Sequence, residues 1–246
     1  MPNERLATGI PGLDEMLSGG FLPGTSVLVR GAPGSGKTSL GLQYLIHGAR
    51  NGQPGLLISF EEFPPSLHRD AESLGWNLAE LEHAGVLRLV FTSPQMLVDG
   101  LSSPQSALSK LISDGGIQRV VLDSITHMTR LTDDTAKLRV IYNAVINGLK
   151  REGATSLLLG EESRATNPRQ EKGRLSFVVD GILLLRYVEV ESAMQRAIVV
   201  LKMRGSDHAK EIRRLEIRKG GLTVADVFEG RENILSGISH RTEAAR

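Results

Sequence analysis

Short apolar runs alternate with amphipathic segments from residue 27 to about residue 159. Each run is continuously apolar, which is typical of strands that are covered on both faces of a sheet. Between the runs, apolar residues recur at helical spacing, as at Leu42, Leu45, Ile46 and Ala49. The pattern therefore predicts an α/β fold with a mostly parallel central sheet flanked by helices. The predicted strands cover residues 27–29, 56–58, 87–91, 120–122 and 155–159.

A long helix is predicted between the last two of these strands. Thr132 is the expected N-cap, and Asp133 and Asp134 suit the positive end of the helix dipole. The apolar stripe of this helix consists of Leu138, Ile141, Tyr142, Val145 and Leu149.

The pattern changes after about Gly173, where three apolar runs follow one another with short connections. Residues 182–187, 197–203 and 211–217 are predicted to form an antiparallel β extension at the C-terminal end of the sheet. Residues 239–246 show no periodicity and are expected to be a mobile tail. We therefore expect one RecA-like domain over residues 1–238.

A phosphate-binding motif follows the first predicted strand. Residues 31–38 read GAPGSGKT and match G-x-x-x-x-G-K-[ST], with an amphipathic helix directly after them. Gly34, Ser35 and Gly36 let backbone N–H groups turn toward phosphate oxygens, where the helix N-terminus adds positive potential. Lys37 is expected to reach the β- and γ-phosphates, and the Thr38 hydroxyl to ligate Mg²⁺. The motif predicts binding of ATP with Mg²⁺.

An acid ends the fourth predicted strand. Asp123 is expected at the carboxyl end of a buried parallel strand, which faces the ligand crevice. There it can hold Mg²⁺ directly or through water. His127 follows shortly after and is a candidate nucleotide sensor or a polar residue of the rim.

Two pairs of adjacent glutamates follow other predicted strands. Glu61 and Glu62 come directly after the second strand, and one of them could orient or deprotonate the attacking water. Repulsion between adjacent carboxylates can also raise the pKa of one of them. Glu161 and Glu162 stand in the same way after the fifth strand. Position alone leaves open which pair acts on the water.

Composition narrows the class of protein. The chain has 246 residues, 40% of them hydrophobic, and a net charge of +1, so no overall field points to nucleic acid or an anionic membrane. The lack of cysteine excludes disulfides and thiolate metal sites. The first residues lack the apolar core of a signal peptide, and no apolar run reaches the roughly 18 residues of a membrane span. We expect a soluble, cytoplasmic protein.

Several segments together resemble the KaiC-like ATPases of the RecA/KaiC superfamily. They are TGIPGLDEML at residues 8–17, SFEE at 59–62, AESLGW at 71–76, VVLDSIT at 120–126 and LKMRGSDH at 201–208. The resemblance extends from about residue 6 to about residue 238. It implies a ring, usually a hexamer, with ATP at each joint between subunits, and a regulatory or signalling role through a partner protein.

The resemblance also implies roles for individual residues. Glu61 and Glu62 become the water-activating pair, and Ser73 becomes a nucleotide contact. Lys202 and Arg204 lie two apart on a predicted strand, so both side chains share one face. From that face they can stabilise the phosphate charge at a neighbouring subunit's nucleotide. The alternative is that they belong to a solvated basic edge strand. The expected contacts to the nucleotide of the neighbouring subunit are Lys202, Met203, Arg204, Ser206 and His208.

One part of the family pattern is only half present. Where a clock member of the family carries adjacent serine and threonine phosphorylation sites, this chain has Ser176 followed by Phe177. A two-site switch is therefore not expected. A weak autokinase reaction on Ser176 alone stays open, beside the alternative that Ser176 is an ordinary serine at a strand edge.

Two other functions compete with the ring-forming ATPase. A RecA-type DNA-binding ATPase is suggested by basic residues between Lys202 and Lys219, but acids interrupt this stretch and only 4% of the residues are aromatic. Nonspecific binding of single strands relies on aromatic stacking and positive charge. The other alternative is a nucleotide-gated scaffold that binds ATP with little turnover.

Overall fold

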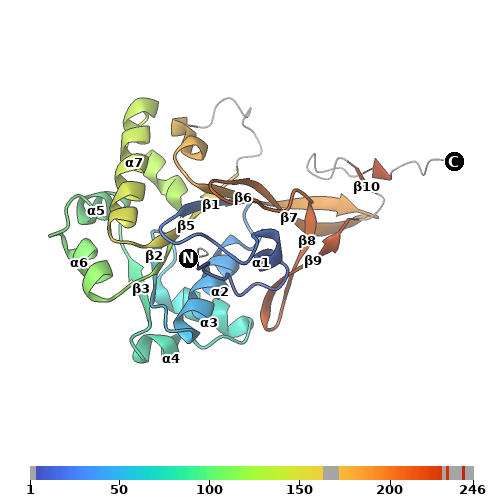
Figure 1. Ribbon diagram of the computed structural model, residues 1–246, viewed down its shortest axis with the longest axis horizontal. Helices are drawn as coiled ribbons and strands as arrows, with labels where there is room; N and C mark the ends of the chain where they lie inside the picture. The colour runs from blue at the N-terminus through green and yellow to red at the C-terminus, as the bar shows by residue number, and fades with distance from the viewer. Residues whose placement is uncertain (1–3, 163–171, 229–230, 233–239, 242–246) are drawn as a thin grey trace.

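The computed structural model describes residues 4–162, 172–228, 231–232 and 240–241. Within them, nine strands form one sheet in the order β3-β2-β4-β5-β1-β6-β7-β8-β9 (Figure 1). The strands are β1 (Ser26–Gly31), β2 (Gly55–Ser59), β3 (Leu87–Phe91), β4 (Arg119–Asp123), β5 (Thr155–Glu161), β6 (Gly181–Val190), β7 (Ala193–Met203), β8 (Arg213–Arg218) and β9 (Gly221–Val227).

Neighbouring strands are parallel from β3 to β6 and antiparallel from β6 to β9. The predicted α/β class, with a mostly parallel sheet and an antiparallel C-terminal extension, is confirmed. Residues 182–187 belong to β6, which pairs antiparallel with β7 and also in parallel with β1, so β6 joins the two parts of the sheet. Strand β9 was not predicted, because several of its residues are exposed and the apolar run is short.

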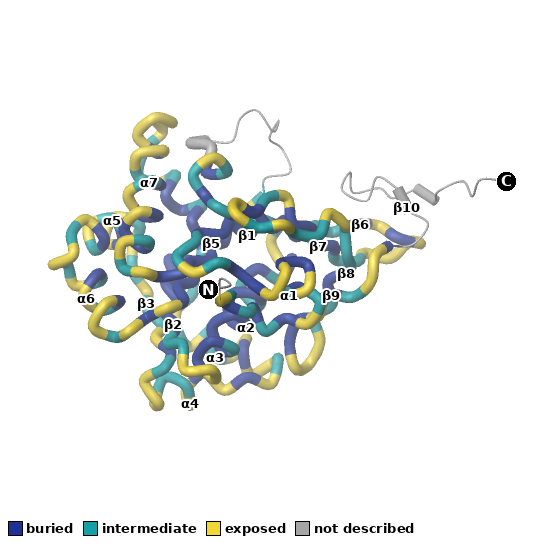
Figure 2. Tube along the Cα trace, viewed as in Figure 1, coloured by how far each residue is buried: buried dark blue, intermediate teal, exposed yellow. Residues whose placement is uncertain are grey.

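Helices cover both faces of the sheet (Figures 1 and 2). Val27 and Val29 of β1 join one apolar core with residues of α2, α3 and α4, whereas Leu28 joins a second core with residues of α5, α6 and α7. This alternation explains the continuous apolar runs, since both faces of each inner strand are buried. The helices are α1 (Leu13–Met16), α2 (Lys37–Arg50), α3 (Pro64–Ser73), α4 (Leu78–His83), α5 (Pro94–Gly100), α6 (Ala107–Asp114) and α7 (Thr135–Arg151), with the 3-10 helices η1 (Ile125–Arg130) and η3 (Lys172–Phe177).

The N-cap of the long helix α7 lies two residues later than predicted. Oδ1 of Asp134 accepts from the backbone N–H groups of Ala136 and Lys137 at 2.8 and 3.2 Å, so Asp134 is the N-cap. Thr132 instead accepts from the backbone of Asp134 in the preceding turn, at 3.1 Å. The prediction failed because Asp is at least as good an N-cap as Thr, so the residue types alone do not place the start of the helix.

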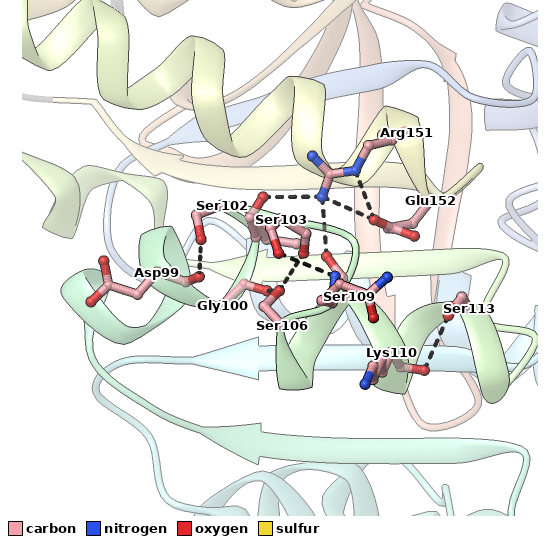
Figure 3. A network of polar contacts seen from close by, with 12 residues as sticks. Asp99, Gly100, Ser102, Ser103, Ser106, Ser109, Lys110, Ser113, Arg151 and Glu152 are labelled. Atoms are coloured by element: carbon pink, nitrogen blue, oxygen red, sulfur yellow. Dashed lines mark hydrogen bonds and ion pairs between the residues drawn. The ribbon is translucent and has the colours of Figure 1, made fainter.

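A polar network ties the α5–α6 connection to the end of α7 (Figure 3). Nη2 of Arg151 donates to Leu101 O and to Ser109 Oγ, both at 3.1 Å, and pairs with Glu152 at 2.9 Å. Ser106 Oγ donates to the carbonyls of Gly100 and Ser103. These bonds provide partners for polar groups of the serine-rich α5–α6 connection within the chain.

None of the described helices is long and apolar enough to cross a membrane. Of the predicted tail, His240–Arg241 forms β11 against β10 (Arg231–Glu232), and residues 239 and 242–246 lie outside the described part.

Candidate active site

The phosphate loop joins β1 to α2 at the carboxyl edge of the parallel strands. Gly34 and Gly36 have φ angles of 75° and 101°, a region that favours glycine. A Cβ on Gly36 would lie 2.6 Å from Cδ1 of Ile217, and one on Gly31 would lie 2.4 Å from Ser35 Oγ. Nζ of Lys37 donates to Gly31 O at 2.9 Å and to Ala32 O at 3.1 Å. The phosphate loop therefore folds closely around the ammonium group of Lys37.

The first turn of α2 meets the end of β4. Thr38 Oγ1 donates to Oδ2 of Asp123 at 2.7 Å. Burial raises the pKa of Asp123, while the Thr38 hydrogen bond and the charge of Lys37 oppose that shift. Two hard oxygen ligands beside a phosphate loop suit Mg²⁺, which usually takes one or two protein ligands plus phosphates and water. In the described ranges no group of three or more His, Cys, Asp or Glu could hold a metal, and a site of this kind does not require one.

The two acids after β2 lie in different environments. Glu61 Oε1 accepts from Arg130 Nη2 at 3.1 Å and lies 2.9 Å from His127 Nε2. Oε2 of Glu62 is buried and has no hydrogen-bond partner in the described part of the chain. Burial raises the pKa of Glu62, and the charges of Asp123, Asp70 and Glu61 raise it further, with Arg69 opposing them. Glu62 is thus the carboxylate with a free oxygen and a raised proton affinity.

The second pair of adjacent glutamates, Glu161 and Glu162, lies at the end of β5 and has different partners. Glu162 forms an ion pair with Arg186 at 2.6 Å, and its backbone N–H donates to Gly31 O. Glu161 is exposed, and its charge raises the pKa of Lys37 against the lowering effect of burial. The charge of Glu162 is therefore offset by Arg186 of β6, and Glu161 lies beside the phosphate loop as a charge partner of Lys37.

Two residues of the β6–β7 hairpin reach the phosphate loop without having been predicted. The Tyr187 hydroxyl donates to Gly34 O at 2.5 Å, and Arg196 Nε lies 3.4 Å from the same oxygen. The guanidinium of Arg196 lies 5.3 Å from the centre of the Tyr187 ring. Their approach depends on β6 lying next to β1, which the local sequence does not indicate.

Ser73 lies at the end of α3 and is exposed, and its hydroxyl donates to Asp70 O at 2.7 Å. The segment after it contacts the β8–β9 hairpin, since the N–H of Gly220 donates to Leu74 O at 2.8 Å. The same hairpin carries Ile217, which packs against Gly36. The segment after Ser73 is therefore linked to the phosphate loop through this hairpin, while the Ser73 hydroxyl bonds within its own helix.

The predicted contacts to a neighbouring subunit gather near the end of β7. Met203 pairs with Gly181, and Gly181 pairs with Val27 near the start of β1, so this group lies at the opposite edge of the sheet from the phosphate loop. Lys202 Nζ donates to Ser176 O at 2.9 Å and to Val179 O at 2.7 Å.

The remaining members of this group also have partners within the chain. Arg204 Nη2 donates to Phe177 O at 2.9 Å. Ser206 accepts from Arg5 at 2.8 Å, and Lys210 Nζ lies 2.8 Å from Nδ1 of His208. Both cations thus hold the backbone next to Ser176. Ser176 itself belongs to the 3-10 helix η3, so the alternative of a serine at a strand edge was wrong.

The known proteins to which this chain is similar match nearly its whole length. The sequence model of a family described as "ATPase: KaiC" matches residues 6–228. The chain is 35% identical to the circadian clock oscillator protein KaiC of Thermostichus vulcanus, over 99% of this chain and 48% of that protein. It is 34% identical to KaiC of Picosynechococcus sp. and to KaiC 1 of Synechocystis sp., in each case over 97% of this chain and 46% of the relative. The chain therefore spans about half the length of the curated relatives it matches.

Proposed function

The chain belongs to the KaiC family of ATPases, and from this premise we propose that it binds ATP with Mg²⁺ and hydrolyses it at joints between like subunits of a ring, usually a hexamer. The observation that carries the proposal is the meeting of Thr38 and Asp123 at 2.7 Å beside the phosphate loop. It brings together the residue types that a nucleotide–magnesium site requires.

Within this proposal each residue has one task. The phosphate loop, with Gly34, Ser35 and Gly36, holds the phosphates through its backbone, and Lys37 offsets their charge. Thr38 and Asp123 would hold Mg²⁺, whose positive charge would offset the charge of the phosphates. Glu62 accepts the proton of the attacking water, because its Oε2 is buried without a partner and its pKa is raised. Ser73 contacts the nucleotide from α3.

The location of the β7 cations supports a site shared between subunits. Lys202 and Arg204 lie at the opposite edge of the sheet from the phosphate loop of the same chain. A head-to-tail contact would bring that edge to the phosphate loop of the next subunit, and such contacts close into rings. Lys202, Met203, Arg204, Ser206 and His208 would then contact the neighbour's nucleotide, where a cation supplied in trans stabilises the transition state.

We further propose that the state of the ring serves regulation or signalling through a partner protein, with weak autophosphorylation of Ser176 as an accessory activity. Binding of DNA has less support, because basic residues of the suggested stretch lie beside acids. Lys210 pairs with Asp207 at 3.2 Å, and Arg218 pairs with Glu216 at 2.8 Å. These pairs reduce the positive field that attracts a phosphate backbone.

The experiment that tests the proposal combines light scattering with an assay of phosphate release, with and without ATP–Mg²⁺. We expect a particle of about six subunits that releases phosphate, as for a closed ring with heterologous contacts. Glu62→Gln should keep ATP binding and lose turnover, while the exposed Glu80→Gln serves as the matched control. A monomer that binds ATP without assembling would overturn the shared site, and equal turnover in Glu62→Gln would overturn the role of Glu62.

A further inference from the structure

The end of β3 and the entry to α3 expose two stacked aromatic rings. The ring centres of Phe63 and Phe91 lie 4.1 Å apart, and their planes differ by 24°. Phe63 is 59% exposed and Phe91 is 41% exposed, so much of the pair stays open to solvent. A single exposed apolar side chain is common on protein surfaces, whereas adjoining exposed rings are typical of a site that binds another surface. We call Phe63 and Phe91 the aromatic platform.

The aromatic platform lies at the same edge of the sheet as the proposed nucleotide site. Ser59 of β2 pairs with Phe91 on one side and with Asp123 on the other. Strands β3 and β4 are thus two strand spacings apart, about 10 Å. Phe63 also follows Glu62 directly in the chain. A neighbouring subunit that covers the nucleotide at this edge therefore comes within reach of the platform.

A second group of exposed apolar side chains lies at the opposite edge, beside the cations of β7. Phe177 at the end of η3 is 57% exposed, and Leu201 is 49% exposed. Leu201 lies at a β-bulge, where the pairing of β6 with β7 shifts register, and such bulges redirect side chains. Arg204 donates to Phe177 O at 2.9 Å, and Lys202 directly follows Leu201. These apolar side chains thus adjoin the two cations that are proposed to reach the next subunit's nucleotide.

We propose that Phe177 of one copy packs on the aromatic platform of the next copy, with Leu201 beside it, and that this contact anchors the joint next to the shared nucleotide site. The occupant of the platform is thus a second copy of this chain. Because the two surfaces lie at opposite edges of the sheet, the contact is head-to-tail and can close into a ring. The inference rests on the proposed ring and adds the side chains that hold its subunits together.

The platform borders on negative charge. Glu61 and Glu62 directly precede Phe63. Arg130 Nη2 lies 3.1 Å from Oε1 of Glu61 and offsets that charge, whereas Oε2 of Glu62 has no hydrogen-bond partner in the described part of the chain. A surface that brings cations to this edge is therefore favoured over an apolar surface without them.

The surface around Phe177 carries such cations. Lys150 Nζ lies 2.6 Å and Arg204 Nη1 lies 3.9 Å from carboxylate oxygens of Asp180. Lys202 Nζ donates to two uncharged backbone carbonyls. These three cations outweigh the acid among them, so positive charge lies beside Phe177. Opposite charges at the two apolar surfaces favour a head-to-tail contact between like copies over a contact between two identical edges.

The chain has no cysteine, so a pair of introduced cysteines tests this contact directly. In the ATP–Mg²⁺ form of the double variant Phe63→Cys/Phe177→Cys, a short bismaleimide should join neighbouring copies and give a ladder of linked chains up to about six on a denaturing gel. Each single variant should give no ladder, because every joint then offers only one thiol. Phe63→Cys/Glu80→Cys, with its second thiol on the exposed surface of α4, is the matched control and should give no ladder either.

The concentration dependence of assembly, followed by light scattering, measures how much the anchor contributes. Phe63→Ser should raise the concentration at which half of the chains are assembled by about ten-fold or more, as expected for the loss of an aromatic anchor from an interface. Phe63→Leu keeps an apolar side chain and should lie between Phe63→Ser and wild type. Phe177→Ser should act like Phe63→Ser and add little to it in the double variant, because both remove the same contact. Both side chains are mostly exposed, so the melting temperatures of the unassembled variants should stay close to wild type.

The possible failures lead to distinct conclusions. If wild-type rings release phosphate, but the double cysteine variant gives no ladder and Phe63→Ser assembles like wild type, the anchor is overturned and the proposed function stands. A ladder from Phe63→Cys alone would mean that two platforms face each other, which likewise overturns the anchor. A thiol in Phe63→Cys rings that reacts with a fluorescent maleimide as fast as in the unassembled chain would leave the platform to a different protein and overturn the anchor as well. A wild type that never assembles would overturn the proposed ring and the anchor together.

Discussion

The hydroxyl of Thr38 donates to Oδ2 of Asp123 across 2.7 Å, which joins the first turn of α2 to the end of β4. Strand β5 lies between β1 and β4 in the sheet, so the contact reaches over one strand. It is possible because the carboxyl ends of parallel strands meet at one edge, where α2 also begins. The fold itself therefore places the Thr38 and Asp123 side-chain oxygens within hydrogen-bonding distance of each other.

Removal of the Thr38 hydroxyl should therefore separate nucleotide binding from magnesium-dependent turnover. Thr38→Ala deletes one of the two protein oxygens that we propose for Mg²⁺, and we expect kcat to fall by about 100-fold or more, since positioning and charge neutralisation dominate this chemistry. Thr38→Ser keeps the hydroxyl and should remain within a few-fold of wild type. Phosphate release measured against magnesium concentration checks both variants. Equal activity of the alanine and serine variants would exclude Thr38 as a magnesium ligand.

A second prediction concerns the pH dependence of turnover. Glu62 must be ionised to accept a proton, so kcat falls as the pH decreases through the pKa of Glu62. Burial and the charges of Asp123, Asp70 and Glu61 raise that pKa, so the loss should begin at a higher pH than for an ordinary glutamate, whose pKa is about 4.3. A profile of kcat against pH gives the position of this limb. Full activity down to pH values near that ordinary pKa would contradict the assignment.

The same pKa shift makes a prediction about stability. The folded chain holds the Glu62 proton more tightly than the unfolded chain, so this group costs stability as the pH rises from the ordinary pKa through the raised one. Glu62→Gln carries no charge and avoids that cost. We expect it to melt roughly 1–3 °C higher than wild type near neutral pH, a modest gain because Glu62 is partly exposed.

Calorimetry at neutral and acidic pH tests this expectation. The difference between Glu62→Gln and wild type should vanish at low pH, where the wild-type carboxyl is neutral as well. Glu80→Gln, on the exposed surface of α4, should show no such difference. A lower melting temperature for Glu62→Gln at neutral pH would mean that the carboxylate is stabilised by contacts that outweigh its burial.

A fourth prediction concerns Arg119, which is only 1% exposed. Its Nη1 donates to Ala7 O at 2.8 Å and to Tyr44 O at 2.9 Å, and its Nε donates to Gln53 at 2.9 Å. Arg119→Met keeps much of the volume but leaves these acceptors without donors, so we expect unfolding to become easier by about 2–3 kcal/mol. Urea unfolding measures the loss, and Arg139→Met is the exposed control, expected within about 0.5 kcal/mol of wild type. Unchanged stability would show that the cost of burying the guanidinium balances its bonds.

Features encoded in one continuous segment could be predicted from the sequence. The phosphate loop needs only its glycines, Lys37 and Thr38 between a strand and a helix, and the structure has that arrangement. The inner strands were evident from their apolar runs because both of their faces are buried. Asp123 was expected to face the same crevice because parallel strands end at a common edge.

Features that depend on which segments become neighbours could not be predicted in this way. The apolar run of β6 does not reveal that β6 pairs in parallel with β1, and so Tyr187 was not recognised as a contact of Gly34. The pairing of Glu162 with Arg186, and of Glu61 with Arg130, depends on the reach of side chains between distant segments. Only the structure separates the four glutamates into paired and unpaired carboxylates.

The last prediction concerns the shared site and uses two variants that should each be inactive. Glu62→Gln lacks the base, and Arg204→Ala lacks the cation that we propose is supplied to the neighbour. If each joint takes Glu62 from one subunit and Arg204 from the next, then an equimolar mixed ring contains joints with both residues intact. About a quarter of the joints would be complete, so the mixture should regain about a quarter of wild-type turnover.

The control keeps both defects in one chain. Glu62→Gln mixed with the double variant Glu62→Gln/Arg204→Ala offers no complete joint and should stay inactive. Because Arg204 also donates to Phe177 O at 2.9 Å within its own chain, the melting temperature of Arg204→Ala must first match wild type closely enough for assembly to be compared. A mixture no more active than its two components, in particles that light scattering shows to be mixed rings, would mean that Arg204 serves only its own chain. If both residues acted on one nucleotide from the same subunit, turnover could not recover, because neither variant chain carries both residues intact.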